Sequence, residues 1–307
     1  MGYDVIGDIH GHASKLEALL RKLGYVERAG AWTPPQGRQA IFLGDLIDRG
    51  PEQVKVVNIV RSMIDAGRAR SVMGNHEFNA IGYATPSRIQ PGEFLRRHSA
   101  KNVAQHVEFL AQVGEGSDLH RELITWFKSL PPMLDLGGIR VVHAWWHEQH
   151  VQLVRGRLPP GESMDDDFVH AAYVKNSLEW AAMEGLTKGL EVSLPAGHSF
   201  VDHSNVERGE VRTKWWHEAP KSYRDVAIVG DAQQHRVPDH ALPADYAGAP
   251  VTGAPVFIGH YWMSGRPELQ SPKVACVDYS AAKDGPLVAY RWNGEQDLDA
   301  ANFVEAG

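Results

Sequence analysis

The stretch DVIGDIHGH, residues 4–12, places metal-binding side chains directly behind a short apolar run. Residues 3–6 are predicted to form a buried strand that ends at Gly7, and the leucines within residues 13–25 recur at helical spacing. The predicted order is therefore strand, loop and helix. A buried strand gives such a loop a rigid base, and its glycines let side chains and backbone project together into a crevice.

The same pattern recurs twice along the chain. Residues 40–43 (AIFL) lead into GDLIDRGP, where Pro51 suits the first turn of a helix, and residues 70–73 (RSVM) lead into GNHE. Three successive strand-to-helix units predict an α/β fold with polar motifs at the carboxyl ends of strands, where ligands bind in such folds. Residues 98–130 are predicted to be helical, and further strands are predicted over 139–146, 255–262, 273–280 and 286–292.

The 307-residue chain is long enough to bury a large core, and we predict a single domain over residues 1–307. Residues 147–250 are less periodic and include loop-like stretches such as LPPGESMDDDF. We expect an insertion or cap there, with one or two helices, for example over residues 166–188. Cys276, the only cysteine, is expected to be a packed thiol in a buried strand.

Composition and charge narrow the class of function. An apolar fraction of 43% and a charged fraction of 22% are those of an ordinary soluble globular protein. The formal net charge of −7 argues against a general polyanion binder, so duplex nucleic acid is not an expected partner. No apolar run approaches the roughly 20 residues of a membrane span. The first acidic motif begins at Asp4 and leaves no room for a signal peptide, so a cytoplasmic location is expected.

Six polar residues at predicted strand ends have side chains that bind divalent metals. They are Asp8, His10, Asp45, Asn75, His143 and His260. Carboxylate, imidazole and amide oxygen suit Mn, Fe or Zn, and six such groups exceed the needs of one ion, so two metals sharing a bridging carboxylate is the economical arrangement. A lone histidine after a strand is more often structural. Five such motifs, each behind an apolar run, are unlikely to be coincidence.

The motifs GD-x-HG, GD-x-x-DRG and GNHE together resemble those of the calcineurin-like metallophosphoesterases. The resemblance is to the phosphoprotein phosphatase branch, which includes bacterial serine/threonine phosphatases and diadenosine tetraphosphatases. It is close over residues 7–77 and looser at His143 and His260. It implies a four-layer α/β/β/α sandwich, with a β-sandwich core flanked by helices, that carries a two-metal site.

The resemblance also assigns roles to the metal-binding residues. Asp8 and His10 would hold the first ion and Asp45 would bridge both. The second ion would be completed by Asn75, His143 and His260. Manganese is favoured, with iron, zinc or nickel as alternatives, because oxygen and nitrogen ligands without a thiolate exclude few metals.

The remaining implied roles concern proton transfer and the phosphoryl group. His76 would be the general acid, oriented by Asp48, and Arg49 would clamp the phosphoryl oxygens together with Asn75. Outside this motif, Arg49 would be read as a surface ion pair and Asp48 as a charge at a helix N-terminus. Glu77 is expected to brace the loop rather than bind metal.

The chain departs from the family pattern in several places. HAWW replaces the usual HAG, so Trp145 and Trp146 could narrow the cleft, stack on a base, or simply pack in the core. The family's additional phosphate-binding arginine has no clear counterpart, and the candidates are Arg212, Lys214 and Arg224. Three basic residues could face a polyphosphate, although a solvated helix face is the favoured interpretation; they are Arg96, Arg97 and Lys101. The histidines not expected to be ligands are His12, His147 and His150.

These features predict a metal-dependent phosphoric-ester hydrolase in which a metal-activated hydroxide attacks phosphorus in line, without a covalent phosphoenzyme. The expected substrate is a phosphoprotein or a small phosphorylated metabolite. The alternative is a dinucleoside polyphosphate hydrolase of the diadenosine tetraphosphatase type. The tryptophan pairs at 145–146 and 215–216, together with Arg96 and Arg97, slightly favour this alternative. A non-catalytic binding protein is the third possibility, and the presence of every ligand argues against it.

Overall fold

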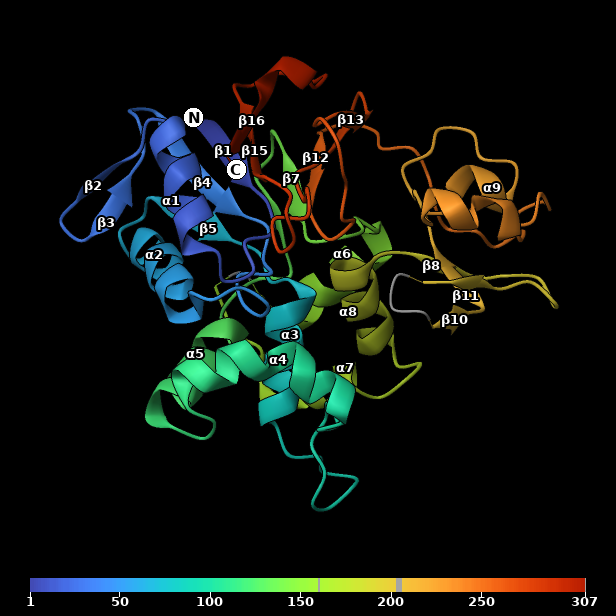
Figure 1. The fold of residues 1–307 in the computed structure, drawn as a ribbon, viewed down its shortest axis with the longest axis horizontal. Coiled ribbons are helices and arrows are strands. Elements are labelled where there is room, and N and C mark those ends of the chain that lie inside the picture. Colours follow the sequence, from blue (N-terminus) through green and yellow to red (C-terminus); the bar gives the residue numbers. More distant parts are fainter. Residues whose placement is uncertain (160, 203–205, 307) are drawn as a thin grey trace. The chain divides into compact units, whose positions relative to one another are not determined.

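The computed structural model describes residues 1–159, 161–202 and 206–306. The chain forms two compact units: one contains Met1–Lys188 together with the chain from Ala254 onward, and the other is Gly189–Gly253. In Figure 1 the larger unit holds every strand and helix next to the metal-binding motifs of the sequence. No helix among the described residues is both long and apolar enough to cross a membrane.

The larger unit is built on two five-stranded sheets. The first has the order β16 (Phe303–Ala306), β15 (Leu287–Trp292), β1 (Gly2–Ile6), β4 (Arg38–Phe42) and β5 (Ala69–Ser71). The second has the order β13 (Leu269–Ser271), β14 (Val274–Cys276), β12 (Val256–Ile258), β7 (Arg140–Val142) and β6 (Met133–Asp135). Strands β1, β4 and β5 are parallel, as are β7, β12 and β14, so several carboxyl ends meet at one edge of each sheet.

The two sheets share one apolar core. Val5 pairs with Ile41 and Tyr290 in the first sheet, and Phe257 pairs with Val141 in the second. Since side chains alternate between the two faces of a strand, these five lie on the inner faces, and all of them belong to one buried cluster. Sheets that pack face to face in this way form a sandwich.

Helices complete the larger unit. Helix α1 (Ala13–Lys22) packs against β15 and β16, and α2 (Gln53–Asp65) packs against β5. The other helices pack mainly on one another and lie below the strands in Figure 1; they are α3 (Asn75–Ala84), α4 (Ala100–Val113), α5 (Asp118–Lys128), α6 (Glu148–Arg157), α7 (Asp166–Ala172) and α8 (Leu178–Lys188). A short hairpin joins β2 (Val26–Arg28) to β3 (Ala31–Thr33). The predicted α/β fold class is confirmed.

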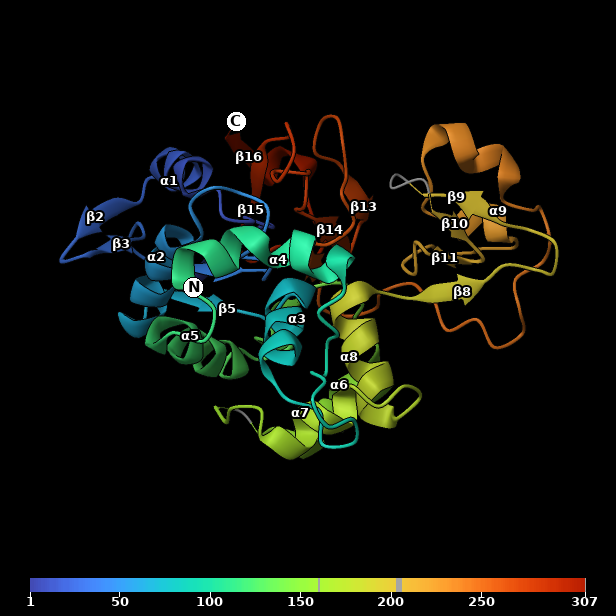
Figure 2. The ribbon, with the colours of Figure 1, turned by 60° about the horizontal axis from the view of Figure 1, so that its bottom comes forward.

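The smaller unit has a core of its own. Strand β8 (Glu191–Ser193) pairs with β11 (Glu210–Arg212), and β9 (Phe200–Val201) pairs with β10 (Glu207–Arg208). These strands and α9 (Tyr223–Val226) are grouped together in Figure 2. The predicted insertion began at residue 147, but α6, α7 and α8 belong to the larger unit, and the compact smaller unit starts at Gly189. A role as a cap stays a prediction.

Candidate active site

The six predicted metal ligands all follow strands, and the structure brings them into one network. Asp8 and His10 follow β1, Asp45 follows β4, Asn75 opens α3 behind β5, His143 follows β7 and His260 follows β12. Because the first three strands are parallel within one sheet and the last two within the other, their carboxyl ends deliver these side chains to one place. All six are buried.

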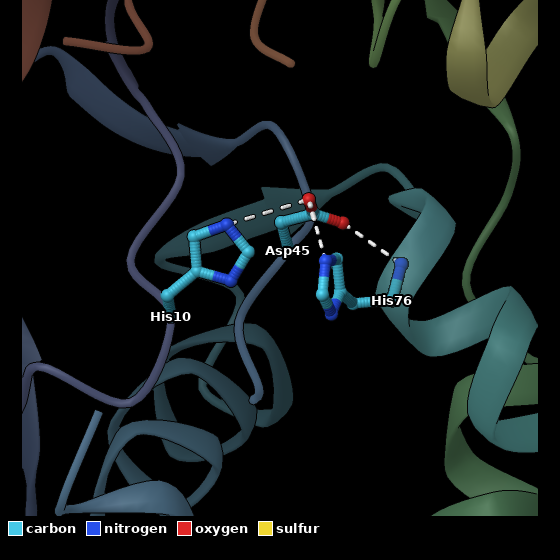
Figure 3. A group of neighbouring side chains, drawn as sticks. All are labelled: His10, Asp45 and His76. Carbon is cyan, nitrogen blue, oxygen red and sulfur yellow. Dashed lines mark hydrogen bonds and ion pairs between the residues drawn. The ribbon is translucent and has the colours of Figure 1, made fainter. Parts of the chain in front are cut away.

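Asp45 lies at the centre of this network. Its Oδ2 atom is 3.6 Å from Nε2 of His10, 3.4 Å from Nε2 of His143 and 3.8 Å from Nε2 of His76. Ligand-capable atoms form two groups that share this carboxylate, one with His10 and His76 and the other with His143 and His260. Figure 3 shows the first group, with both imidazoles turned toward Asp45. A carboxylate shared by two groups suits a bridging position between two cations.

Backbone carbonyls fix the orientation of two of the imidazoles. Nδ1 of His10 is 3.0 Å from the carbonyl oxygen of Ile47, and Nδ1 of His143 is 2.6 Å from that of Leu43. Because a carbonyl only accepts, each Nδ1 carries hydrogen, and each Nε2 is directed at Asp45. Burial lowers the pKa of His10 to about 3, which keeps it neutral and able to ligate.

Burial alone would also lower the pKa of His143, but the carboxylates of Asp45 and Asp8 outweigh it and raise the pKa to about 10. The proton on His143 compensates the negative charge of these two carboxylates. A divalent cation would compensate that charge more fully, and its binding would displace the proton. The electrostatics of the cluster therefore fit a cation.

Asp8 gives a second test of this fit. Its Oδ2 accepts a hydrogen bond from the backbone amide of His260 at 3.0 Å, whereas its buried Oδ1 has no hydrogen-bond partner in the described part of the chain. Burial, together with the charge of Asp278, raises the pKa of Asp8 well above its usual value. A buried carboxylate oxygen without a partner is costly unless a cation coordinates it.

A carboxylate orients His76. Nδ1 of His76 lies 2.5 Å from Oδ2 of Asp48, which leaves Nε2 on the side of Asp45. The other oxygen of Asp48 lies 2.6 Å from Nδ1 of His106. Burial raises the pKa of Asp48, but the nearby His76 and the hydrogen bonds from both imidazoles outweigh it and lower the pKa to about 2. Asp48 is therefore a fixed anion that can hold a proton on His76.

Arg49 is half-buried beside the carboxylates. Its guanidinium lies over the ring of Trp262, 4.0 Å from the centroid, and the ammonium of Lys283 lies 4.4 Å from the same centroid. Among the described residues no ion pair is recorded for Arg49, so its charge remains available to a phosphoryl group. The indole holds Arg49 in place through cation–π attraction.

Backbone strain is concentrated here. Five non-glycine site residues have left-handed φ values between 47° and 73°; they are His10, Asp45, Asp48, Arg49 and His260. Glu77 offsets part of this strain, because its carboxylate accepts hydrogen bonds from the backbone amides of Asp45, Leu46 and Gly74 at 2.8–2.9 Å. The expected bracing role of Glu77 therefore matches its contacts.

Comparison with known proteins places this geometry in a family. The family model for calcineurin-like phosphoesterases matches residues 1–249. The chain belongs to this family. The asymmetrical bis(5'-nucleosyl)-tetraphosphatase PrpE of Geobacillus thermodenitrificans is 49% identical over 146 residues, and that of Bacillus subtilis is 31% identical over 146 residues. Each match covers 47% of this chain and 57% of the relative, so the chain spans little more than half the length of these relatives.

The fold has a counterpart among solved structures as well. A protein serine/threonine phosphatase from Saccharomyces cerevisiae, with similarity to human phosphatase PP5, is 15% identical and aligns over 99% of this chain and 78% of its own, with a TM-score of 0.51. This likeness supports the fold of the phosphoesterase.

Among the residues around the site that were not predicted, His106, Gln53 and Asp278 make hydrogen bonds there. His106 and Gln53 lie on helices and support Asp48; Gln53 accepts from the amide of Asp48 at 2.6 Å and donates to the carbonyl of Gly50. Asp278 follows β14 and accepts from the amides of Trp262 and Ser280. Asp278 obeys the same rule as the predicted ligands, a carboxylate behind an apolar strand, and that rule could have found it.

Both tryptophan pairs are buried rather than exposed to a ligand. Trp145 is 5% exposed and its ring stacks on that of His147, and Trp146 is 8% exposed beneath Arg140. The pair at 215–216 is buried within the smaller unit. Core packing, one of the alternatives for these residues, is therefore what the structure shows, and their support for a nucleotide is lost.

Two of the candidates for the additional phosphate-binding residue have structural contacts instead. Arg212 pairs with Glu191, and Arg224 donates to the carbonyl of Val237, both within the smaller unit. The acidic stretch at 165–167 caps α7 and forms ion pairs with Lys128 and Arg88. Cys276 is fully buried, as expected.

Proposed function

We propose that the chain is a two-metal phosphoesterase that hydrolyses phosphoric esters or anhydrides with water. The observation that carries the proposal is the position of Asp45, whose carboxylate is shared by two groups of ligand atoms and lies beside the oriented imidazole of His76. The residues of both groups are complete, which disfavours a binding protein that has lost its chemistry.

The six proposed ligands would be divided between two ions. Asp8 and His10 would hold one ion and Asp45 would bridge both, while the other ion would be completed by Asn75, His143 and His260. Manganese is proposed, with iron, zinc or nickel as alternatives, since ligands that are all oxygen or nitrogen suit each of these metals. Two divalent cations would supply Lewis acidity, stabilising charge on the phosphoryl oxygens and lowering the pKa of a water molecule.

The residues of the chain would supply binding and proton transfer. Arg49 and Asn75 would bind the phosphoryl oxygens, and the fixed position of Arg49 on Trp262 would orient the substrate for in-line attack. His76, held through Nδ1 by Asp48, would give the proton at Nε2 to the leaving oxygen, a contribution typically worth about 10²–10⁴-fold in rate.

The substrate would be a phosphoprotein, a small phosphorylated metabolite, or a dinucleoside polyphosphate. The names of the tetraphosphatase relatives favour the dinucleoside polyphosphate. Duplex nucleic acid is not proposed as a partner, and a cytoplasmic location stays a prediction.

The test is turnover with Mn²⁺ on four substrates: a phosphomonoester, a phosphodiester, a phosphopeptide and diadenosine tetraphosphate. Asp45→Asn and His76→Asn should lower kcat/KM by at least about 100-fold, the scale of losing a metal bridge or a general acid. Asp65→Asn, at an exposed position on α2, is the matched control and should retain activity. Wild-type rates in folded Asp45→Asn protein would refute the proposed roles.

A further inference from the structure

Arg96 is a half-buried arginine without an acidic partner. Its guanidinium donates to Oδ1 of Asn79 at 2.7 Å and to Oε1 of Gln105 at 2.9 Å, and both partners are neutral amides. Arg96 forms no ion pair within the described residues. Its neighbour Arg97 differs in being exposed, so that solvent surrounds its charge. Buried or half-buried charges are normally paired, so a guanidinium held only by neutral groups is suited to an anion supplied from outside.

Gln105 connects this arginine to His76. A guanidinium only donates, so the amide oxygen of Gln105 must face Arg96 and its NH₂ group must face the other way. That NH₂ nitrogen lies 3.4 Å from Nε2 of His76, the atom beside Asp45. His76, Gln105 and Arg96 therefore form a row of side chains in contact, which begins beside the metal ligands. The last two side chains of this row carry hydrogen-bond donors.

The surrounding elements hold this line in place. The backbone amide of Arg96 donates to the carbonyl of Gly82 near the end of α3, and Asn79 lies one turn after Asn75 on the same helix. Gln105 is on α4, next to His106, whose contact with Asp48 fixes that helix against the site. Asn79, Arg96 and Gln105 pack around the same narrow void as Asp48, which is too small to hold a water molecule. Figures 1 and 2 both show α3 beside α4.

We propose that Arg96 and Gln105 form a subsite for an anionic leaving group, so that the preferred substrates are phosphoanhydrides, in which a second phosphate follows the scissile bond. The inference rests on the proposed function, in which Nε2 of His76 faces the leaving oxygen. The group attached to that oxygen would extend past His76, where Gln105 and Arg96 donate hydrogen bonds.

The reaction is a balanced hydrolysis. The oxygen of water forms the new bond to the scissile phosphorus, and the bond from that phosphorus to the bridging oxygen breaks. The electron pair of the broken bond stays on the leaving phosphate, which takes a proton from His76 or leaves as the anion, while the proton lost by water passes to the solvent. Arg96 would neutralise the charge that the leaving phosphate carries, and an uncharged alcohol would gain nothing from it.

The test compares tripolyphosphate with p-nitrophenyl phosphate, using the full chain with Mn²⁺. Both carry a terminal phosphoryl group and a good leaving group, but only tripolyphosphate has phosphate oxygens beyond the scissile bond. In Arg96→Gln we expect kcat/KM for tripolyphosphate to fall roughly 10- to 100-fold relative to that for p-nitrophenyl phosphate, the scale of hydrogen bonds to charged groups. Arg97→Gln is the matched control and should keep the wild-type ratio.

A second variant guards against misfolding. Gln105→Glu places a carboxylate beside Arg96, which preserves the contact between the two side chains while making the subsite anionic. It should shift the ratio in the same direction, because like charges disfavour binding of a polyphosphate. Equal losses on both substrates in folded Arg96→Gln would show a structural role and overturn the proposal, as would an unchanged ratio.

Binding separates this inference from the proposed function. Absence of wild-type turnover on any phosphate compound would refute the function. The affinity of the chain for tripolyphosphate, measured by calorimetry, would still decide the subsite: a loss of roughly tenfold or more in Arg96→Gln supports it, and equal affinity in the variant and the wild type overturns it.

Discussion

Nδ1 of His106 lies 2.6 Å from Oδ1 of Asp48, the carboxylate oxygen that does not contact His76. The imidazole of His106 is buried between the rings of Tyr83 and Phe109, with centroid distances of 5.2 and 4.9 Å. A carboxylate held by imidazoles on both oxygens cannot easily rotate about its side chain. The orientation of His76 therefore depends on a residue of α4 that contacts Asp48 rather than His76 itself.

Replacing His106 should impair proton donation more than binding. His106→Phe removes one hydrogen bond to Asp48, and we expect kcat for an alkyl phosphate to fall roughly tenfold or more, part of the typical general-acid contribution. His106→Asn, whose amide can reach Asp48 from nearly the position of Nδ1, should restore part of the loss. Steady-state kinetics with p-nitrophenyl phosphate provide the contrast, because its leaving group needs less protonation. Equal losses on both esters would contradict a role through His76.

Glu77 should stabilise the fold through the strained loop. Its two oxygens accept from the amides of Asp45, Leu46 and Gly74, so Glu77→Gln would turn an NH₂ group toward backbone donors. The expected loss is about 1–3 kcal/mol in the free energy of unfolding, the cost of buried donors left without an acceptor. Urea unfolding of the metal-free protein measures it. Glu122→Gln, at an exposed ion pair with Arg61, is the control and should change little.

The residues that we propose as metal ligands could be picked out from the sequence because their chemistry is local. Each follows an apolar strand, and parallel strands bring such ends together whatever the details of packing. His106 and Gln53 could not be found in this way, because each supports Asp48 from a helix and only tertiary packing brings it there. The burial of Trp145 could not be predicted for the same reason. Its position behind a strand does not reveal whether other elements pack over its side chain. Nor could the sequence of residues 147–188 show that α6, α7 and α8 pack within the larger unit.

Gly259 leaves space for Asp8, which we propose as a metal ligand. A Cβ atom at this position would lie 2.1 Å from Oδ1 of Asp8, the buried oxygen that lacks a hydrogen-bond partner within the described ranges. Gly259→Ala should therefore displace Asp8 and weaken Mn²⁺ binding by about 10- to 100-fold, as changes next to metal ligands typically do. Calorimetric titration of the metal-free protein measures the affinity. Gly156→Ala, where nothing lies within 4 Å of the added carbon, should bind Mn²⁺ as the wild type does.

Tyr25 should make the phosphoesterase sensitive to alkali. Its hydroxyl donates to Oδ2 of Asp4 at 3.0 Å, and Asp4 also pairs with Arg38 and Arg291. Burial and the charge of Asp4 raise the pKa of Tyr25 far above its ordinary value of about 10. Above pH 10 the unfolded chain loses this proton while the folded chain keeps it, so the stabilisation present below pH 10 is lost as the pH rises.

Tyr25→Phe separates this effect from that of other tyrosines. The variant should be less stable at pH 8 by about 1.5–3 kcal/mol, the value of a hydrogen bond to a charged group. Its free energy of unfolding should then fall less steeply between pH 10 and 12, by up to about 1.4 kcal/mol per pH unit for the one proton removed. Urea unfolding at several pH values gives both slopes. Because Tyr173 and Tyr290 remain in both proteins, parallel slopes would mean that Tyr25 ionises equally readily in the folded and unfolded chains.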